Sequence, residues 1–293
     1  MNSIELKSRA KINLSIDVLG KREDGYHLVE MIMQTIDLYD IIKIDELCSD
    51  NIIINSNSED IPLDSNNIVY KAINLIRDTF NIKKGVKVFI QKNIPIAAGM
   101  AGGSSNAAAI LVGLNKLWNL NLSEVELQRL GFKLGADVPF CISGKPALAQ
   151  GVGEELSYIK GLPKDVEILI CKPEIFVSTK KVYEGLDLNN IEIRPNNKQL
   201  LKYLEEEDIS SLAVNMANVL ESVTSKLYKE IKDIESIMID NNALGSMMSG
   251  SGPTVFGLYR NKEEALKCKE ELLKKYKQVY LVNSSERGVE ING

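Results

Sequence analysis

The sequence contains a single histidine, His27, among its 293 residues. One histidine excludes zinc sites that need several imidazole ligands, including the HExxH type of metalloprotease. A Ser-His-Asp hydrolase would have to use His27, and the sequence has no G-x-S-x-G motif to accompany it. We therefore do not expect a zinc enzyme of this type or a serine hydrolase.

Paired cysteines and long apolar runs are also missing. The four cysteines stand at positions 48, 141, 171 and 268, without any C-x-x-C spacing, so we expect reduced and mostly buried thiols. No run of about 18 apolar residues predicts a membrane span. The first residues have no apolar signal-peptide core, and we expect a cytoplasmic protein.

The charge balance is slightly acidic, with 40 acidic and 35 basic side chains and a net charge of −5. This balance argues against an extended basic groove for nucleic acid. Phosphates remain possible ligands, because backbone N–H groups, a few lysines and Mg²⁺ can supply positive potential locally. The chain is 44% hydrophobic, enough for a substantial core.

The periodicity of apolar residues predicts a mixture of strands and helices. In the first half we expect strands over residues 5–20, 27–45, 52–54 and 86–91, and helices over 67–80, after 105 and from the capping box Ser123-x-x-Glu126 to Gly135. In the second half we expect strands over 166–171, 254–259 and 279–282, and helices within 179–239 and over 262–276. This order is typical of an α+β protein.

Glycine and proline cluster in residues 151–164 and predict a domain boundary there. We expect an N-terminal domain of residues 1–155 and a C-terminal domain of residues 156–293.

The segment from Pro95 to Ser105 carries the strongest chemical signal. Its three glycines, Gly99, Gly102 and Gly103, allow backbone angles that other residues avoid and let a ligand approach the main chain. A helix follows, whose first N–H groups lack partners and whose dipole favours anions. The segment is suited to nucleotide phosphates, although composition alone also fits a glycine-rich turn without a ligand.

Two well-known phosphate motifs do not match this segment. A Walker A loop needs a Gly-Lys-Ser/Thr run, and no lysine follows these glycines. A dinucleotide-binding loop needs G-x-G-x-x-G after the first strand, which is not the spacing here. A dehydrogenase is therefore not expected.

The pattern P-x-x-x-G-x-x-G-x-S-S-x-A-A, beginning at Pro95, resembles the central motif of the GHMP kinases. The segment 10–14, AKINL, is similar to the first motif of that family, and 248–256, MSGSGPTVF, is similar to its third. The three motifs occur in the family's order. The resemblance implies a ribosomal-protein-S5-like N-terminal domain, a ferredoxin-like C-terminal domain and a requirement for ATP and Mg²⁺.

Further strings resemble one branch of that family, which phosphorylates a cytidine-diphospho sugar alcohol on its 2-hydroxyl in isoprenoid-precursor synthesis. These are 24–27, DGYH; 135–140, GADVPF; and 177–179, VST, with Tyr183 nearby. The partners implied are ATP and that small molecule, with no nucleic acid and no membrane, in a monomer or a homodimer.

The resemblance implies a role for individual positions. Asp137 matches the catalytic aspartate that faces the acceptor hydroxyl, and Lys11 the lysine beside it. The expected nucleotide-binding residues are Pro95, Ala97, Ala98, Gly99, Met100, Ala101, Gly102, Gly103, Ser104 and Ser105. The expected substrate-binding residues are Asn13, Tyr26, His27, Thr179, Tyr183 and Gly250; Tyr26 and Tyr183 would stack on the cytosine and His27 would read its edge.

Two alternatives remain open at this point. A related GHMP kinase acting on homoserine or mevalonate would need no cytidine and would leave the D-G-Y-H string unexplained. A nucleotide-binding module without catalysis would be expected to lack Asp137 or Lys11, and both are present.

Overall fold

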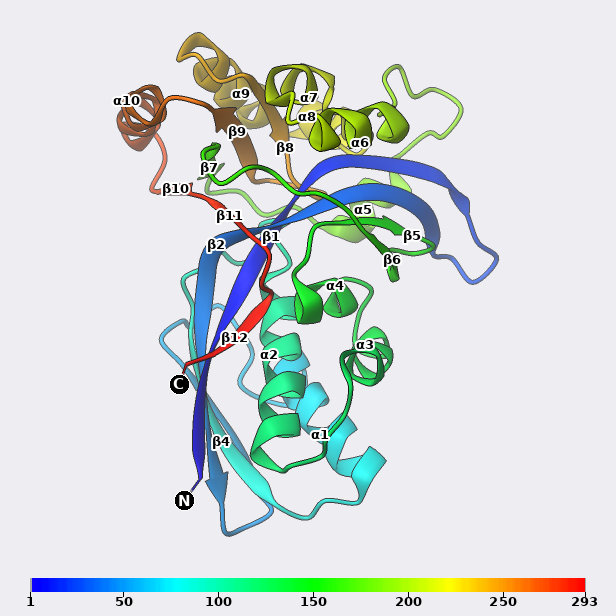
Figure 1. Cartoon of the computed structure of the whole chain (residues 1–293), viewed down its shortest axis with the longest axis vertical. Helices are drawn as coiled ribbons and strands as arrows, with labels where there is room; N and C mark the ends of the chain where they lie inside the picture. The colour runs from blue at the N-terminus through cyan, green and yellow to red at the C-terminus, as the bar shows by residue number, and fades with distance from the viewer. Residues whose placement is uncertain (1, 293) are drawn as a thin grey trace.

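Two long antiparallel strands connect the two ends of the molecule. A computed structural model describes residues 2–292, in which β1 (Ser3–Lys21) and β2 (His27–Leu47) form one hairpin. In Figure 1 this hairpin rises from the N-terminus, bends near the middle and crosses under the upper helices. Its pairing shifts register between Arg9 and Lys11 and again between Asn13 and Ser15. Such bulges bend a strand and re-aim its side chains.

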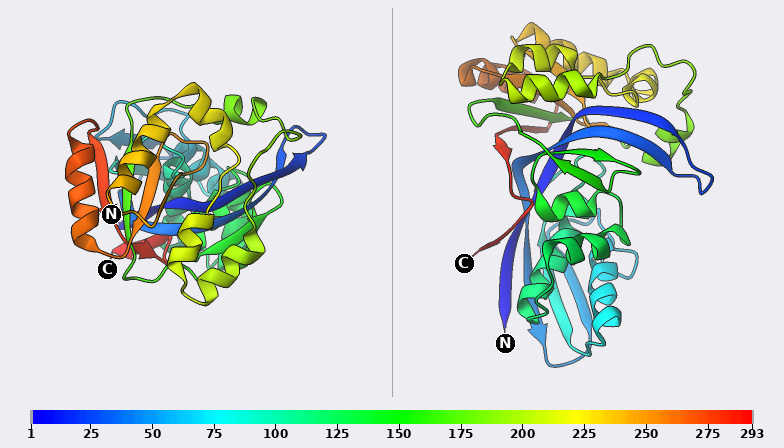
Figure 2. Two further views of the ribbon diagram at one scale, coloured as in Figure 1. Left: turned by 90° about the horizontal axis from the view of Figure 1, so that it is seen from above. Right: turned by 45° about the vertical axis from the view of Figure 1, so that its right-hand side comes forward.

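The first sheet has the order β12-β1-β2-β4-β3, and its strands β3, β4 and β12 lie in the lower half of Figure 1. Besides the hairpin, its strands are β3 (Ile52–Ser56), β4 (Gly85–Gln91), β5 (Ala147–Gln150), β6 (Glu155–Tyr158), β11 (Ser284–Ser285) and β12 (Val289–Asn292). In this sheet, strands β3 and β4 are parallel to each other. The helices on its face are α1 (Ile68–Phe80), α2 (Gly102–Leu117), α3 (Glu124–Phe132) and α4 (Val138–Ser143). The right-hand view of Figure 2 shows these helices together on one side of the strands.

Helix α2 packs very closely on the hairpin. A Cβ atom at Gly113 would lie 2.7 Å from Cδ1 of Ile44 and 3.1 Å from Cδ1 of Leu6, so a larger residue would require these side-chain ends to move. The small residues 107–109, all alanine, are also completely buried. This close packing fixes the position of the helix whose first turn follows the phosphate-type loop.

The second sheet is antiparallel, with the order β10-β7-β9-β8. Its strands are β7 (Glu167–Lys172), β8 (Gly245–Met248), β9 (Val255–Tyr259) and β10 (Gln278–Val282). The helices of this half are α5 (Thr179–Glu184), α6 (Asn197–Glu205), α7 (Ile209–Asn215), α8 (Glu221–Leu227), α9 (Glu230–Asp240) and α10 (Lys262–Leu273).

The two sheets share one hydrophobic cluster. Ile12 and Ile32 of the hairpin belong to the same buried cluster as Ile168 and Phe256 of the second sheet. Burying apolar surface between the sheets is the main source of attraction between them. The hairpin therefore holds its own side chains in a defined position relative to both halves of the molecule.

The structure confirms the α+β class and most predicted elements. The capping box at Ser123 is present, and Asn67 caps α1 through its side chain. Helix α3 ends at Phe132, so the prediction that it extends to Gly135 was wrong, and α2 begins earlier than predicted, at Gly102. The short strands β5, β6, β8, β11 and β12 were not predicted.

The division at residue 155 stays a prediction. Strand β6 runs across that point, and β11 and β12 return to the first sheet near the end of the chain. The cysteines are unbonded, and Cys141, Cys171 and Cys268 are buried, as predicted, whereas Cys48 is exposed. Within residues 2–292, no helix has the length and apolar character needed to cross a membrane.

Candidate active site

A cleft of about 900 Å³ lies where the hairpin, the loop before α2, helix α5 and the loop after β8 approach one another. Most residues predicted from the sequence line it: Lys11, Asn13, Tyr26, His27, Pro95, Ala97, Ala98, Gly99, Ala101, Gly102, Gly103, Ser104, Asp137, Thr179, Tyr183 and Gly250. Residues far apart in the chain therefore meet at one place. A cleft of this size with convergent polar groups is typical of a small-molecule site.

The loop of residues 95–101, which we call the phosphate loop, has an unusual backbone. Ala97 (φ 51°), Gly99 (φ 72°) and Ala101 (φ 56°) all adopt the left-handed conformation. For alanine this costs on the order of 1–2 kcal/mol per residue. The strained loop delivers the chain into α2 with Gly102, Gly103 and Ser104 along the cleft, where the first N–H groups of a helix lack intrahelical partners.

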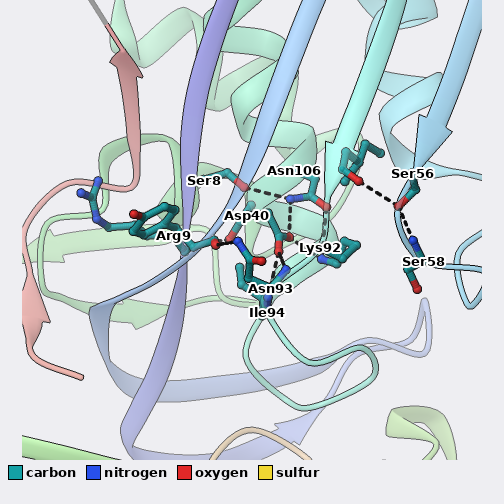
Figure 3. Close-up of polar contacts among 12 residues, drawn as sticks. Ser8, Arg9, Asp40, Ser56, Ser58, Lys92, Asn93, Ile94 and Asn106 are labelled. Carbon is teal, nitrogen blue, oxygen red and sulfur yellow. Dashed lines mark hydrogen bonds and ion pairs between the residues drawn. The ribbon is translucent and has the colours of Figure 1, made fainter. Parts of the chain in front are cut away.

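A buried ion pair lies at the start of this loop, as Figure 3 shows. The Asp40 carboxylate is completely buried; its Oδ1 accepts from the backbone N–H groups of Asn93 (2.7 Å) and Ile94 (2.8 Å). Its Oδ2 accepts from Nδ2 of Asn106 (2.7 Å) and from Nζ of Lys92. With four donors the buried charge is fully satisfied, so the ion pair can fix the start of the loop.

The neutral side chain of Asn106 suits this position. Its Nδ2 donates to Ser8 Oγ (2.8 Å) and to Asp40, while its Oδ1 lies 3.3 Å from Lys92 Nζ. An aspartate here would place a second carboxylate against Asp40, without the two N–H donors. The asparagine therefore supplies hydrogen-bond donors to the buried network at the start of the loop.

The phosphate loop touches the loop of residues 249–254, which we call the glycine loop, backbone to backbone. A Cβ atom at Gly99 would lie 2.3 Å from the carbonyl oxygen of Ser249, and one at Gly250 would lie 2.8 Å from that of Gly99. Ser249 Oγ also donates to the Gly99 carbonyl (3.2 Å). Neither glycine can carry a side chain without displacing one loop from the other.

Lys11 and Asp137 face each other beside this contact. The Lys11 side chain is nearly buried, and its Nζ donates to Asn13 Oδ1 (2.7 Å) and the Gly99 carbonyl (3.3 Å). It lies 4.0 Å from Asp137 Oδ2. A buried ammonium needs such acceptors, because it has lost its water. Lys11 and Asn13 share one face of β1 because they are two residues apart in a strand.

The Asp137 carboxylate does not cap the helix that follows it. Asp137 stands immediately before α4, but its side chain makes no hydrogen bond to the helix. It is partly exposed and lines the cleft. Tyr183 and Cys141 lie close enough to be affected by its negative charge. Burial, and then this charge, raise the pKa of each to about 12. Both groups therefore stay protonated at neutral pH.

Aromatic side chains form the other end of the cleft. His27 begins β2, and its ring centroid lies 4.8 Å from that of Tyr183, with the planes inclined by 34°. Tyr26, in the preceding turn, is 62% exposed. Burial, and then the positive charge of Lys21, lower the pKa of His27 below 6.5. The imidazole is therefore neutral at pH 7, with one donor and one acceptor nitrogen.

Helix α5 and the glycine loop are linked at this end. Thr179 Oγ1 and Ser251 Oγ lie 2.8 Å apart, within hydrogen-bond distance. Ser251 and Gly250 line the cleft beside Thr179. The glycine loop thus contacts both the phosphate loop and the helix that carries Tyr183.

Two predicted residues lie outside the cleft lining. Met100 is buried in the core, and Ser105 Oγ donates to the backbone carbonyl of Arg9 (2.6 Å). No role was predicted from the sequence for Asp40, and Ser251 was marked only as part of the motif 248–256. Residues 92–96, which include Lys92, were expected to border the adenine pocket, without individual contacts; Lys92 lines the cleft.

We predict that Gly99→Ala weakens nucleotide binding by tenfold or more and lowers Tm. The alanine would have both an unfavourable φ of 72° and a Cβ clash with Ser249. Calorimetric titration with ATP and a thermal melt measure the two effects. Gly20→Ala is the matched control, because its Cβ would meet nothing within 4 Å. Equal affinities of the two variants for ATP would contradict the importance of this contact.

Comparison with known families identifies both halves of the chain. The family model described as the GHMP kinases N terminal domain matches residues 67–145, and the GHMP kinases C terminal model matches residues 200–278. The matched ranges include the phosphate loop in the first half and the glycine loop in the second.

Relatives of known function align over almost the whole chain. A 4-diphosphocytidyl-2-C-methyl-D-erythritol kinase of Clostridioides difficile (strain 630) is 70% identical over 293 residues, which is 100% of this chain and 99% of the relative. The kinase of the same name from Caldicellulosiruptor saccharolyticus is 51% identical over 281 residues, covering 96% of this chain and 97% of the relative.

Solved structures share the fold. A crystal structure of 4-(cytidine 5'-diphospho)-2C-methyl-D-erythritol kinase superimposes with a TM-score of 0.81 at 29% identity, covering 96% of this chain and 99% of the other. A homoserine kinase from Cytophaga hutchinsonii superimposes with a TM-score of 0.80 at 19% identity, covering 100% of this chain and 98% of the other. At this identity the match shows the fold alone. Together, these matches show that the chain belongs to the GHMP kinase family and, within it, to the 4-diphosphocytidyl-2-C-methyl-D-erythritol kinases.

Proposed function

We propose that this protein transfers the γ-phosphoryl group of ATP to the 2-hydroxyl of 4-diphosphocytidyl-2-C-methyl-D-erythritol, in the non-mevalonate route to isoprenoid precursors. The observation that carries this proposal is the position of Lys11 and Asp137. They stand 4.0 Å apart between a loop suited to phosphates and an aromatic end suited to a base. We further propose that the enzyme is a cytoplasmic monomer or homodimer.

The phosphate loop and the first turn of α2 would hold the triphosphate of ATP. Backbone N–H groups at a helix start bind anions well, and Gly102 and Gly103 leave the main chain accessible. Lys92 lies close to this turn, since its Nζ is 3.3 Å from the place of a Cβ at Gly102. Met100 and Ser105 would act indirectly, by holding the loop in the core and to β1.

Asp137 would orient the acceptor hydroxyl and accept its proton. Phosphoryl transfer passes through a loose transition state, in which positioning and charge neutralisation matter more than a strong base. Lys11, held by Asn13 and Gly99, would neutralise charge that develops on the transferred group. This division of roles needs no further acid or base in the cleft.

Mg²⁺ would enter the site bound to ATP. No cluster of three or more His, Cys, Asp or Glu side chains with metal-binding geometry exists within residues 2–292. Magnesium in nucleotide sites keeps phosphate and water ligands and needs only one or two protein oxygens, so this cleft fits it. Ser104, at the start of α2, would supply such an oxygen, and the ion would neutralise phosphate charge.

The aromatic end would bind cytosine. Tyr183 and Tyr26 can stack on a base, whichever base it is. Neutral His27 can donate one hydrogen bond and accept another at the base edge, and unpaired groups there would penalise a wrong base. Thr179, Asn13 and Gly250 also line the cleft and would contact the diphosphate and the sugar alcohol.

We predict that the purified protein consumes ATP with 4-diphosphocytidyl-2-C-methyl-D-erythritol and not with homoserine or mevalonate. Asp137→Ala should reduce this turnover by about 10³-fold or more while leaving ATP affinity within about threefold, because the carboxylate orients the acceptor. A coupled ADP assay and calorimetry give the two quantities. Turnover of homoserine or mevalonate at a similar rate, or substantial turnover by Asp137→Ala, would contradict the proposal.

We predict that KM for the cytidine substrate rises as the pH falls below 6.5. The pKa of His27 in the folded protein is lower than 6.5, so the imidazole is neutral above that pH and gains a proton only below it. Protonation removes its acceptor nitrogen and weakens the contact with the base edge. KM for ATP should stay nearly constant over the same range.

The control for this pH effect is His27→Gln, which has a donor and an acceptor but does not titrate. It should have a raised KM for the cytidine substrate that no longer changes between pH 7.5 and 5.5. The same rise in KM with acid in His27→Gln would show that another group is responsible.

A further inference from the structure

Asn218 lies three residues before the start of α8, is 7% exposed and points at the glycine loop. Its Nδ2 donates to the carbonyl oxygens of Met248 (2.9 Å) and Gly250 (2.8 Å). Its Oδ1 accepts from the N–H of Leu220 (3.0 Å). One buried amide thus fixes two carbonyls on either side of Ser249.

Neighbours of Asn218 hold the same loop. Glu221 Oε2 accepts from the N–H of Met248 (2.9 Å), and Thr224 Oγ1 donates to the carbonyl of Ser251 (3.1 Å). The glycine loop has little regular structure of its own, and both of its glycines, Gly250 and Gly252, take a positive φ. Its shape therefore depends on side chains from residues 218–224.

The segment with Asn218 is also tied to β1. The N–H of Ile16 donates to the carbonyl of Ala217 (3.0 Å), and the N–H of Val219 donates to the carbonyl of Ile16 (3.0 Å). Strand β1 carries Lys11 and Asn13. Asn218 is consequently held at a fixed distance from the strand that bears the proposed catalytic lysine.

The contacts continue from the glycine loop to that lysine. Ser249 Oγ donates to the Gly99 carbonyl (3.2 Å), and the N–H of Asn13 points at Ser249 Oγ (3.4 Å). The Gly99 carbonyl also accepts from Lys11 Nζ (3.3 Å). A shift of Ser249 would therefore move the phosphate loop at Gly99, and with it the carbonyl that accepts from Lys11.

We propose that Asn218 is a positioning residue for phosphoryl transfer, which acts through the glycine loop to hold Gly99 and Lys11 in register with the acceptor. The inference rests on the proposed function. It assigns Asn218 no contact with either substrate. Loss of its two donor bonds displaces Ser249, and misplacement by about 1 Å can cost on the order of 10²-fold in rate.

The test variant is Asn218→Asp, which keeps the acceptor for Leu220 and loses both donors. We expect kcat, expressed per ATP-binding site counted by calorimetry, to fall about tenfold or more. KM for the cytidine substrate should stay within about threefold, because the aromatic end is untouched. Because kcat is divided by the number of ATP-binding sites, a slower enzyme can be distinguished from a preparation with fewer folded molecules.

The matched control is Asn115→Asp, remote from the cleft. Asn115 Nδ2 donates to the Leu122 carbonyl (3.0 Å) and its Oδ1 accepts from the Leu122 N–H (2.9 Å), so the same exchange removes a donor bond to a carbonyl and keeps an acceptor bond to an N–H. This control should have a lower Tm and an unchanged kcat per site. If both variants kept the wild-type kcat per site, Asn218 would be only structural.

Ser249→Ala breaks the same path one step later and gives an independent test. It should lower kcat per site in the same way, and the double variant with Asn218→Asp should be little slower than the slower single variant. The inference would be overturned if the rate losses of the two single variants multiplied in the double variant, or if Ser249→Ala kept the wild-type kcat per site. An inactive wild-type enzyme would instead contradict the proposed function.

Discussion

The site depends on one backbone contact, between Gly99 of the phosphate loop and residues Ser249 and Gly250 of the glycine loop. These segments come from the two halves of the chain and approach so closely that neither glycine can carry a side chain. The shared hydrophobic cluster along the hairpin brings the halves together. The contact then fixes the Gly99 carbonyl, on which the buried Lys11 ammonium depends.

A net negative protein builds a phosphate site here by local arrangement of a few charges. Lys11 and Lys92 are both nearly buried, and each has oxygen acceptors that compensate for lost water. The strained loop and the first turn of α2 add N–H donors. Left-handed Ala97 and Ala101 show that the loop's shape is maintained at a conformational cost, a common feature of functional sites.

Motif order was enough to predict the fold and to bring Lys11, Asp137, His27 and Tyr183 into one cleft. The support beneath the loop was not predictable. Asp40 and Lys92 are 52 residues apart in the chain, and only the register of β2 on β4, with Ile41 opposite Gln91, makes them neighbours. Contacts that end on backbone carbonyls, such as those of Asn218 or of the Ser105 hydroxyl, leave no pattern in the sequence.

A crystal structure of the enzyme with a non-hydrolysable ATP analogue and 4-diphosphocytidyl-2-C-methyl-D-erythritol would test the central claim most directly. The account predicts the triphosphate on the phosphate loop, cytosine against Tyr183 with its edge at His27, and the 2-hydroxyl within hydrogen-bond distance of Asp137. A cytosine bound elsewhere, or a 2-hydroxyl remote from both Asp137 and the γ-phosphate, would contradict it.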